Sequence, residues 1–144
     1  MPKPHTIGHL ATATGTKINT IRFYEEIGLM PAAARTASGR RTYDETDRVR
    51  LTFIRRGRAM GFSVPAIRSL IELSARPEGD CASIALIARR HICEIDDKIA
   101  ALTAARTALE RVSDACAGGR VAECRIIEAI ALSPALEPTV ATSA

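Results

Sequence analysis

The stretch DCASIALIARRHICEIDDKIAALTAARTALERVSDACAGGRVAEC, residues 80–124, decides the fold of this chain. We expect one long helix, because no Gly or Pro interrupts the stretch before Gly118 and Gly119. Asp80 is well placed to cap the start of this helix, and the two glycines suit its end. Apolar residues recur at steps of three, four or seven and line one side of the helix, near a coiled-coil seam. These residues are Ile84, Ala88, Ile92, Ile95, Ile99, Leu102, Leu109 and Val112.

Three cysteines mark the two ends of the expected helix. Cys81 lies in its first turn, and Cys116 and Cys124 flank the glycine turn at its other end. The helix extends roughly 50 Å at about 1.5 Å per residue, so Cys81 cannot meet the other two thiols within one chain. The apolar seam has no partner helix of similar length and therefore predicts a homodimer. If the two long helices pair antiparallel, three thiols converge at each end of the dimer and can hold a soft metal ion.

Charge is distributed unevenly along the chain. The chain has 144 residues, enough for one domain or two small ones, and aromatic residues make up 3% of it. Residues 1–76 carry 13 Lys and Arg against 6 Asp and Glu, whereas residues 77–144 carry 7 against 10. The basic first part predicts a nucleic-acid-binding module, joined to a mildly acidic part with another role.

The sequence favours a cytoplasmic protein. Its apolar runs are too short to span a bilayer, and its first residues do not form an apolar signal segment. We therefore expect the four cysteines to be mostly reduced, which favours metal or redox chemistry over structural disulfides. We do not expect an enzyme, because the sequence shows neither a nucleophile–base set nor a phosphate-binding loop.

Two short helices near the N-terminus predict a helix-turn-helix. The first begins after Thr6, which can cap it, and Thr14-Gly15-Thr16 ends it. Thr16 is expected to cap the second helix, over residues 17–27. An ordinary helical corner has the same pattern, so this feature alone leaves the function open.

A wing and two further helices are expected before the long helix. The turn Ser38-Gly39, within a basic stretch, suits a short β hairpin. A third helix is expected over residues 44–60, and a fourth over residues 64–73 with Ser63 as its cap. After the glycine turn, residues 125–132 predict a last short helix.

Four motifs in the first half resemble the MerR family of transcriptional regulators. They are Ile7–Leu10, TIRFYEEIGL at 20–29, GRRTY at 39–43 and MGFS at 60–63. The resemblance spans residues 6–131 and implies an all-α fold with a small β wing. In this fold a winged helix-turn-helix head precedes a long antiparallel coiled-coil dimerisation helix and a C-terminal metal-binding loop. The expected divisions are residues 6–75 for the head, 80–113 for the dimerisation helix, 114–132 for the loop and short helix, and 133–144 for a disordered tail.

Candidate DNA contacts lie on the second helix and on the wing. Phosphates and base edges are read by Arg, Lys and hydroxyl side chains, although a single Arg is more often merely solvated. The resemblance places DNA contacts at Arg22, Tyr24, Arg41 and Tyr43 in particular. The full candidate set is Lys17, Thr20, Arg22, Tyr24, Arg35, Arg40, Arg41 and Tyr43.

The candidate metal ligands are Cys81, Cys116 and Cys124. Cys124 precedes the last short helix, whose dipole lowers a thiol pKa and favours the metal-binding thiolate. A pair of cysteines spaced this way is by itself more often buried and inert, and the dimer argument is what favours a metal site. Cys93 and His91 lie in the middle of the long helix, where we expect a structural role or none.

The identity of the metal is left open between two groups. Seven residues separate Cys116 from Cys124, and this spacing, with the following Arg125-Ile126-Ile127-Glu128, resembles the copper-sensing members. Cys81 instead resembles the position at which sensors of zinc, cadmium, lead and mercury have Cys. Three sulfurs suit a soft divalent ion, Hg, Pb, Cd or Zn, which we favour, whereas the loop pair alone suits Cu(I).

The predicted function is therefore a metal-responsive transcriptional activator. Its homodimer would bind a palindromic promoter operator. The resemblance implies that the metal-bound dimer distorts promoter DNA so that RNA polymerase can engage both promoter elements. A thiol redox sensor that closes a Cys116–Cys124 disulfide is the alternative from another class. The loop lacks the four clustered cysteines of the iron–sulfur members, and the chain lacks the larger ligand domain of the drug sensors.

Overall fold

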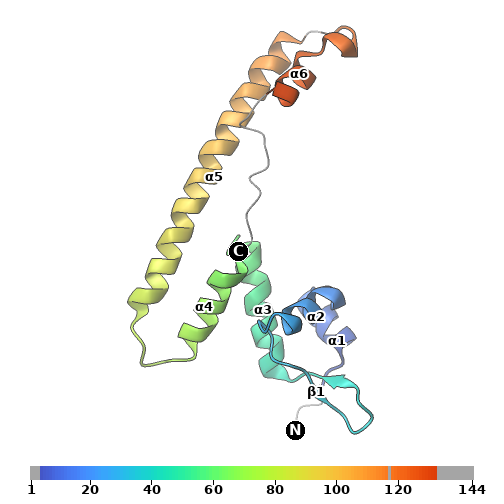
Figure 1. Ribbon diagram of the computed structural model, residues 1–144, viewed down its shortest axis with the longest axis vertical. Coiled ribbons are helices and arrows are strands. Elements are labelled where there is room, and N and C mark those ends of the chain that lie inside the picture. The colour runs from blue at the N-terminus through green and yellow to red at the C-terminus, as the bar shows by residue number, and fades with distance from the viewer. Residues whose placement is uncertain (1–3, 117, 133–144) are drawn as a thin grey trace. The chain divides into compact units, whose positions relative to one another are not determined.

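The computed structural model describes residues 4–116 and 118–132, and most of them are helical (Figure 1). The chain divides into two compact units, Met1–Ile87 and Ala88–Ala144. The first unit, here called the head, contains α1 (Ile7–Thr14), α2 (Ile18–Glu26), β1 (Ala34–Arg35), β2 (Arg41–Thr42), α3 (Glu45–Ala59) and α4 (Val64–Ser74). Helix α5 (Cys81–Ala115) leads into the second unit, which continues with the 3₁₀ turn η1 (Val121–Glu123) and α6 (Arg125–Leu132).

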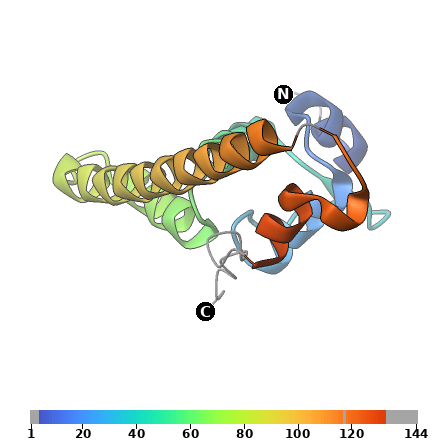
Figure 2. The same ribbon diagram turned by 90° about the horizontal axis from the view of Figure 1, so that it is seen from above.

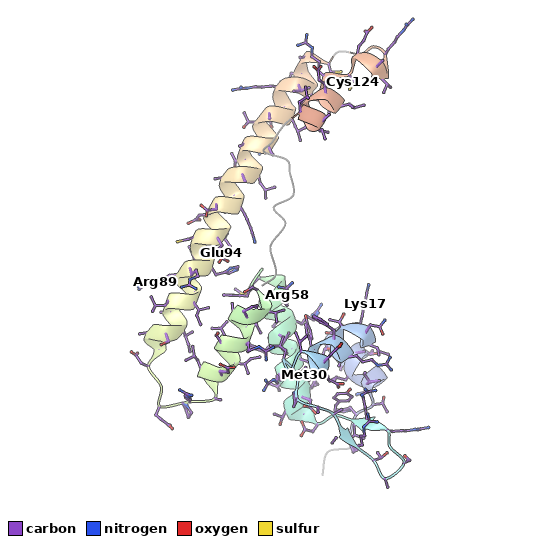
Figure 3. All side chains as sticks on the ribbon, in the orientation of Figure 1. Lys17, Met30, Arg58, Arg89, Glu94 and Cys124 are labelled. Carbon is purple, nitrogen blue, oxygen red and sulfur yellow. The ribbon has the colours of Figure 1, made fainter. Side chains whose placement is uncertain are left out.

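A hydrophobic core joins the helices and the wing of the head. Helix α1 packs against α2 and α3, and α3 packs against α4. A Cβ atom at Gly57 would lie 3.1 Å from Ile67 Cδ1, so the missing side chain lets α3 and α4 approach closely. Met30, labelled in Figure 3, is 1% exposed and belongs to this core. The core consists of Leu10, Ile21, Tyr24, Leu29, Met30, Tyr43, Leu51, Ile54 and Ile67.

Polar caps fix the starts of several helices where the sequence predicts them. Thr6 Oγ1 accepts a hydrogen bond from the backbone N–H of His9 at 3.2 Å, which confirms Thr6 as the cap of α1. Ser63 Oγ accepts from the N–H of Ala66 at 3.2 Å and caps α4. Asp80 Oδ1 accepts from the N–H of Ala82 at 3.0 Å at the start of α5.

The sequence places the N-cap of α2 at Thr16, one residue too early. Lys17 occupies the N-cap and makes no side-chain cap bond in the described structure, and Thr16 Oγ1 is buried without a hydrogen-bond partner among the described residues. Gly15 adopts the left-handed conformation, with φ of 64°, and the Thr16 amide donates to Ala11 O at 3.0 Å. This bond ties Thr16 to the preceding turn, so α2 begins one residue later than expected.

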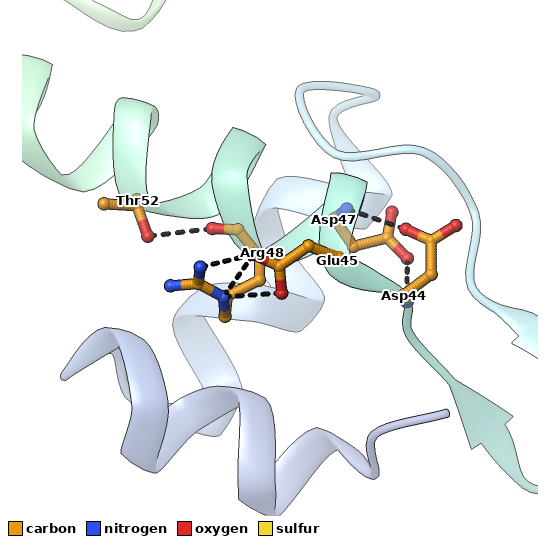
Figure 4. A network of polar contacts seen from close by, with 5 residues as sticks. All are labelled: Asp44, Glu45, Asp47, Arg48 and Thr52. Carbon is orange, nitrogen blue, oxygen red and sulfur yellow. Dashed lines mark hydrogen bonds and ion pairs between the residues drawn. The ribbon is translucent and has the colours of Figure 1, made fainter. Parts of the chain in front are cut away.

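Helix α3 starts with a reciprocal capping box (Figure 4). Asp44 Oδ1 accepts from the N–H of Asp47, and the N–H of Asp44 donates to Asp47 Oδ2, both at 2.9 Å. In the first turn Glu45 forms an ion pair with Arg48, three residues along the helix. The capping box supplies acceptors for N–H groups at the helix start, and the Glu45 carboxylate places negative charge at the positive end of the helix dipole.

The wing is a short antiparallel hairpin, as the Ser-Gly turn predicts. Ala34 pairs with Thr42 and Arg35 with Arg41, and Gly39 in the connecting loop has a φ of 81°. The backbone of His5 exchanges two hydrogen bonds with Tyr43, at 2.8 and 2.9 Å. The chain just before α1 therefore anchors the base of the wing.

Helix α5 confirms the long helix, with 35 residues in one uninterrupted segment (Figure 2). Several of its apolar residues are exposed, including Ile92 (54%), Ile99 (56%) and Leu102 (70%). Among the described residues, no helix is both long and apolar enough to cross a membrane. The expected tail over residues 133–144 lies outside the described residues, and the domain divisions stay predictions.

We expect Asp44→Ala to lower the free energy of unfolding by about 1 kcal/mol, because the N–H group of Asp47 at the start of α3 loses its acceptor. Asp44→Asn retains a side-chain acceptor and should lose only part of this stability. Urea unfolding followed by circular dichroism measures both variants. Equal stability of Asp44→Ala and the wild type would show that the capping box contributes nothing.

Candidate DNA interface and metal site

The second helix of the helix-turn-helix, α2, has one face in the core and one face exposed. Ile21 and Tyr24 are buried, whereas Lys17 and Arg22 are exposed. In Figure 3 the side chain of Lys17 extends away from the head. The arrangement leaves basic side chains of α2 accessible to a DNA backbone, as a recognition helix requires.

Two arginines outside the predicted set hold the end of α2. Arg68 of α4 donates to the carbonyl oxygens of Ile27 at 2.6 Å and Gly28 at 3.2 Å, and Arg50 of α3 donates to Leu29 O at 2.9 Å. Cations are favourable at the negative end of a helix, where carbonyl groups lack intrahelical partners. Arg50 and Arg68 therefore fix the end of α2 against α3 and α4.

Three of the predicted DNA contacts come together between α2 and the wing. Arg22 of α2, Arg35 of β1 and Arg41 of β2 line one hollow of about 410 Å³. Arg35 Nη1 also donates to Gly39 O at 2.8 Å, across the wing loop. Lys17 lines a separate hollow at the start of α2, and Arg40 is exposed in the wing loop. Thr20 is half-buried on α2.

The two predicted tyrosines belong to the core. Tyr24 is 7% exposed and Tyr43 only 1%. The Tyr43 hydroxyl donates to Glu25 Oε1 at 2.5 Å, and burial together with this hydrogen bond raises the pKa of Tyr43 well above its usual value. Both rings therefore help to hold the head together, and a contact from either hydroxyl to DNA stays a prediction.

Cys116 and Cys124 come together in the second unit. Both thiols are half-buried and line a hollow of about 240 Å³, together with Arg120 and Arg125. Figure 3 shows Cys124 at the start of α6. The backbone N–H groups of Ile127 and Ile126 at this helix start lower the pKa of the Cys124 thiol, as does its hydrogen bond with Cys116. The lowered pKa was expected from the sequence, and it favours the thiolate that binds soft metals.

Cys81 lies far from this pair within one chain. It is exposed in the first turn of α5, and Cys116 follows the last turn of the same 35-residue helix, roughly 50 Å away at about 1.5 Å per residue. Within residues 4–116 and 118–132, no three His, Cys, Asp or Glu side chains are grouped to hold a metal ion. A three-thiol site therefore needs a second copy of the chain, and it stays a prediction.

His91 and Cys93, for which the sequence predicts no metal-binding role, differ in burial. His91 is 5% exposed, with Nδ1 at 3.2 Å from Glu94 Oε2, in line with a structural role. Cys93 is exposed.

Comparison with known proteins decides the family. The model of the MerR HTH family regulatory protein matches residues 5–73, and that described as MerR, DNA binding matches residues 48–112. The heavy metal-dependent transcription regulator 1 of Rhizobium meliloti is 41% identical over 118 residues, which cover 82% of this chain and 80% of the relative. The chain belongs to the MerR family of transcription regulators.

Two further relatives of this MerR-family chain span nearly its whole described length. The transcriptional regulator ZntR of Escherichia coli K12 is 36% identical over 129 residues, covering 88% of this chain and 92% of ZntR. The crystal structure of PbrR691 from Ralstonia metallidurans, in complex with lead(II), matches with a TM-score of 0.71 and 34% identity. That match covers 88% of this chain and 98% of PbrR691. The resemblance read from the sequence motifs is confirmed, and so is the mostly helical fold with a small two-stranded wing and one long helix that it implies.

We expect Cys124 of the reduced, metal-free MerR-family protein to react with iodoacetamide at lower pH in the folded chain than in urea. The N–H groups at the start of α6 stabilise its thiolate only when the helix is folded. Mass spectrometry of the Cys124 peptide, over a pH series with and without urea, gives both midpoints. Coincident midpoints would show that the helix start does not activate this thiol.

Proposed function

We propose that this MerR-family protein is a metal-responsive activator of transcription, in which a soft divalent ion controls a promoter-bound homodimer. The observation that carries the proposal is the pairing of Cys116 with Cys124, whose thiol pKa is lowered, in one hollow beside two arginines. The names of the relatives support it, because one is described as heavy metal-dependent and another is a complex with lead(II). Because its target is DNA, we place the protein in the cytoplasm.

The exposed face of the head supports the DNA-binding half of the proposal. Lys17, Arg22 and Arg40 are exposed, and Arg22, Arg35 and Arg41 share one hollow. Phosphate contacts by such side chains supply most of the affinity of a protein for DNA, and they fix its position on the duplex. We propose that these residues and Thr20 contact the operator, and that Tyr24 and Tyr43 contribute mainly by holding α2 and the wing.

The pattern of α5 supports the homodimer. Counted in sevens, one line along the helix carries Cys81, Ala88, Ile95, Leu102 and Leu109 and ends at Cys116. Ile92 and Ile99 lie beside this line and are more than half exposed. An apolar line of this kind gains free energy when a second helix covers it, and a repeat of seven is the pattern of a coiled coil. In the proposed dimer both cysteines of this line lie in or next to the seam.

The antiparallel arrangement would complete the metal site. Cys81 of one subunit then lies beside Cys116 and Cys124 of the other, and the three thiolates would hold Hg, Pb, Cd or Zn. Cu(I) held by Cys116 and Cys124 alone is the alternative, which the hydrogen bond between these two side chains supports. A disulfide between the same pair would instead make the protein a redox sensor.

A physical connection from Cys81 to the recognition helix is the proposed route of control. Residues 75–80 separate α4 from α5, and α4 supplies Arg68, which holds the end of α2. A metal ion shifts the dimer only if it binds one conformation more tightly than the other. We propose that the metal-bound conformation distorts the promoter so that RNA polymerase engages it.

We expect the reduced wild-type dimer to bind one Pb(II) at each end, and Cys81→Ser to bind it at least about tenfold more weakly because a thiolate ligand is lost. Cys93→Ser is the control: it removes a thiol from the same helix that is not part of the proposed site, and it should bind Pb(II) like the wild type. Titration against a competing chelator, followed by sulfur-to-lead charge-transfer absorption, measures these affinities. Unchanged Pb(II) affinity in Cys81→Ser, with Cu(I) binding lost in Cys124→Ser, would favour the copper alternative.

We expect footprinting of the dimer on its promoter to show metal-dependent distortion at the operator centre, with the protected ends unchanged. The heads keep their phosphate contacts while the DNA between them is deformed. Cys116→Ser with saturating metal serves as the control that cannot switch. An identical cleavage pattern with and without metal would contradict the distortion mechanism.

A further inference from the structure

One carboxylate, that of Glu25, links the recognition helix to the wing. It accepts a hydrogen bond from the Tyr43 hydroxyl on Oε1 at 2.5 Å, and Oε2 lies 3.4 Å from Arg41 Nε. Glu25 belongs to α2, and Arg41 and Tyr43 belong to the end of the wing, so the three residues join two elements by side chains alone. The Glu25 side chain is only 10% exposed. A carboxylate so far removed from water needs such partners.

The ion pair uses a particular part of the Arg41 side chain. Glu25 faces Nε, and the side chain of Arg41 remains 37% exposed. The terminal guanidinium nitrogens carry the remaining N–H donors, and these donors suit the oxygens of a phosphate. Glu25 can therefore fix the direction of the guanidinium without occupying its terminal donors.

The surroundings of Arg41 suit a phosphate. Arg22 from α2 and Arg35 from β1 line the same hollow as Arg41, and so do Glu25 and Glu26. An acidic side chain near DNA repels phosphates, so the Glu25 charge by itself would weaken DNA binding. Its hydrogen bond and ion pair with the wing point to a structural role that offsets this repulsion.

We propose that Glu25 is a positioning residue for DNA binding: its carboxylate holds Arg41 against α2 so that the guanidinium meets a backbone phosphate. The inference rests on the proposed function, because it concerns how the same head engages DNA. It assigns to an acidic residue a favourable effect on the binding of an anionic partner. Simple electrostatics predicts the opposite effect of the Glu25 charge on DNA affinity, so the two explanations can be told apart by experiment.

Glu25→Gln is the informative substitution. Glutamine retains an oxygen that can accept the Tyr43 hydroxyl, but it loses the charge that holds Arg41. Glu26→Gln is the matched control, because Glu26 is the next residue, lines the same hollow and carries the same charge. Both variants remove one negative charge beside the DNA, so electrostatics alone predicts tighter binding for both.

We expect Glu25→Gln to bind duplex DNA roughly three- to tenfold more weakly than the wild type, and Glu26→Gln to bind as tightly or more tightly. The duplex is one selected by the wild-type dimer from a random library. The slope of log affinity against log salt should fall by about 0.9 for each phosphate contact that Glu25→Gln loses. Thermal unfolding of each variant shows whether the head is folded at the assay temperature.

A double-mutant cycle tests whether Glu25 acts through Arg41. In an Arg41→Gln background, Glu25→Gln should no longer weaken binding, because the group that it positions is absent. If Glu25→Gln lowers affinity equally in both backgrounds, or if folded Glu25→Gln binds like Glu26→Gln, the positioning role is overturned. Wild-type protein that selects no duplex would overturn the proposed DNA-binding function itself.

Discussion

The length of α5 constrains everything that the second unit can do. A continuous helix of 35 residues separates Cys81 from Cys116 by roughly 50 Å, at about 1.5 Å per residue, so these two thiols do not meet within one chain. The apolar line that ends at these two cysteines is exposed at Leu102, and Ile99 beside it is exposed as well. In the proposed dimer, a second long helix that covered this line would remove apolar surface from water and would also supply the third thiol. In this proposal the metal site and the dimer interface therefore depend on each other.

Local chemistry made much of the fold predictable. Thr6, Ser63 and Asp80 were recognised as helix caps because a cap depends only on its own side chain and the next few backbone N–H groups. The same is true of Cys124, whose thiol pKa is lowered by the helix start that follows it. Thr16 was misassigned because a left-handed glycine before it moved the helix start by one residue. The short 3₁₀ turn η1 was missed because three residues show no periodicity.

The candidate DNA-binding surface was less predictable because residue type does not reveal burial. Tyr43 has the chemistry of a phosphate ligand, yet its hydroxyl meets Glu25, which lies 18 positions earlier in the sequence. Arg68 reaches back 41 positions to Ile27 O. Such partners follow from the packing of α2 against the wing and α4, and a sequence pattern along one helix does not contain that information. The exposed arginines could be named from the sequence, whereas the buried partner Glu25, which contacts Arg41 and Tyr43, could not.

The way in which α2 is held limits how a metal signal can act. Arg50 and Arg68 hold its end against α3 and α4, and the Glu25 carboxylate holds the wing against its exposed side. Moving α2 within the head would break several charge-assisted hydrogen bonds, each of which is stronger than a neutral one. In the proposed mechanism, a displacement at Cys81 would therefore be easier to absorb by moving α1 to α4 as one body, through residues 75–80 between α4 and α5. In the proposed mechanism, two heads that moved as rigid bodies would change their separation or angle on the duplex, and the DNA between them would have to bend or untwist to follow.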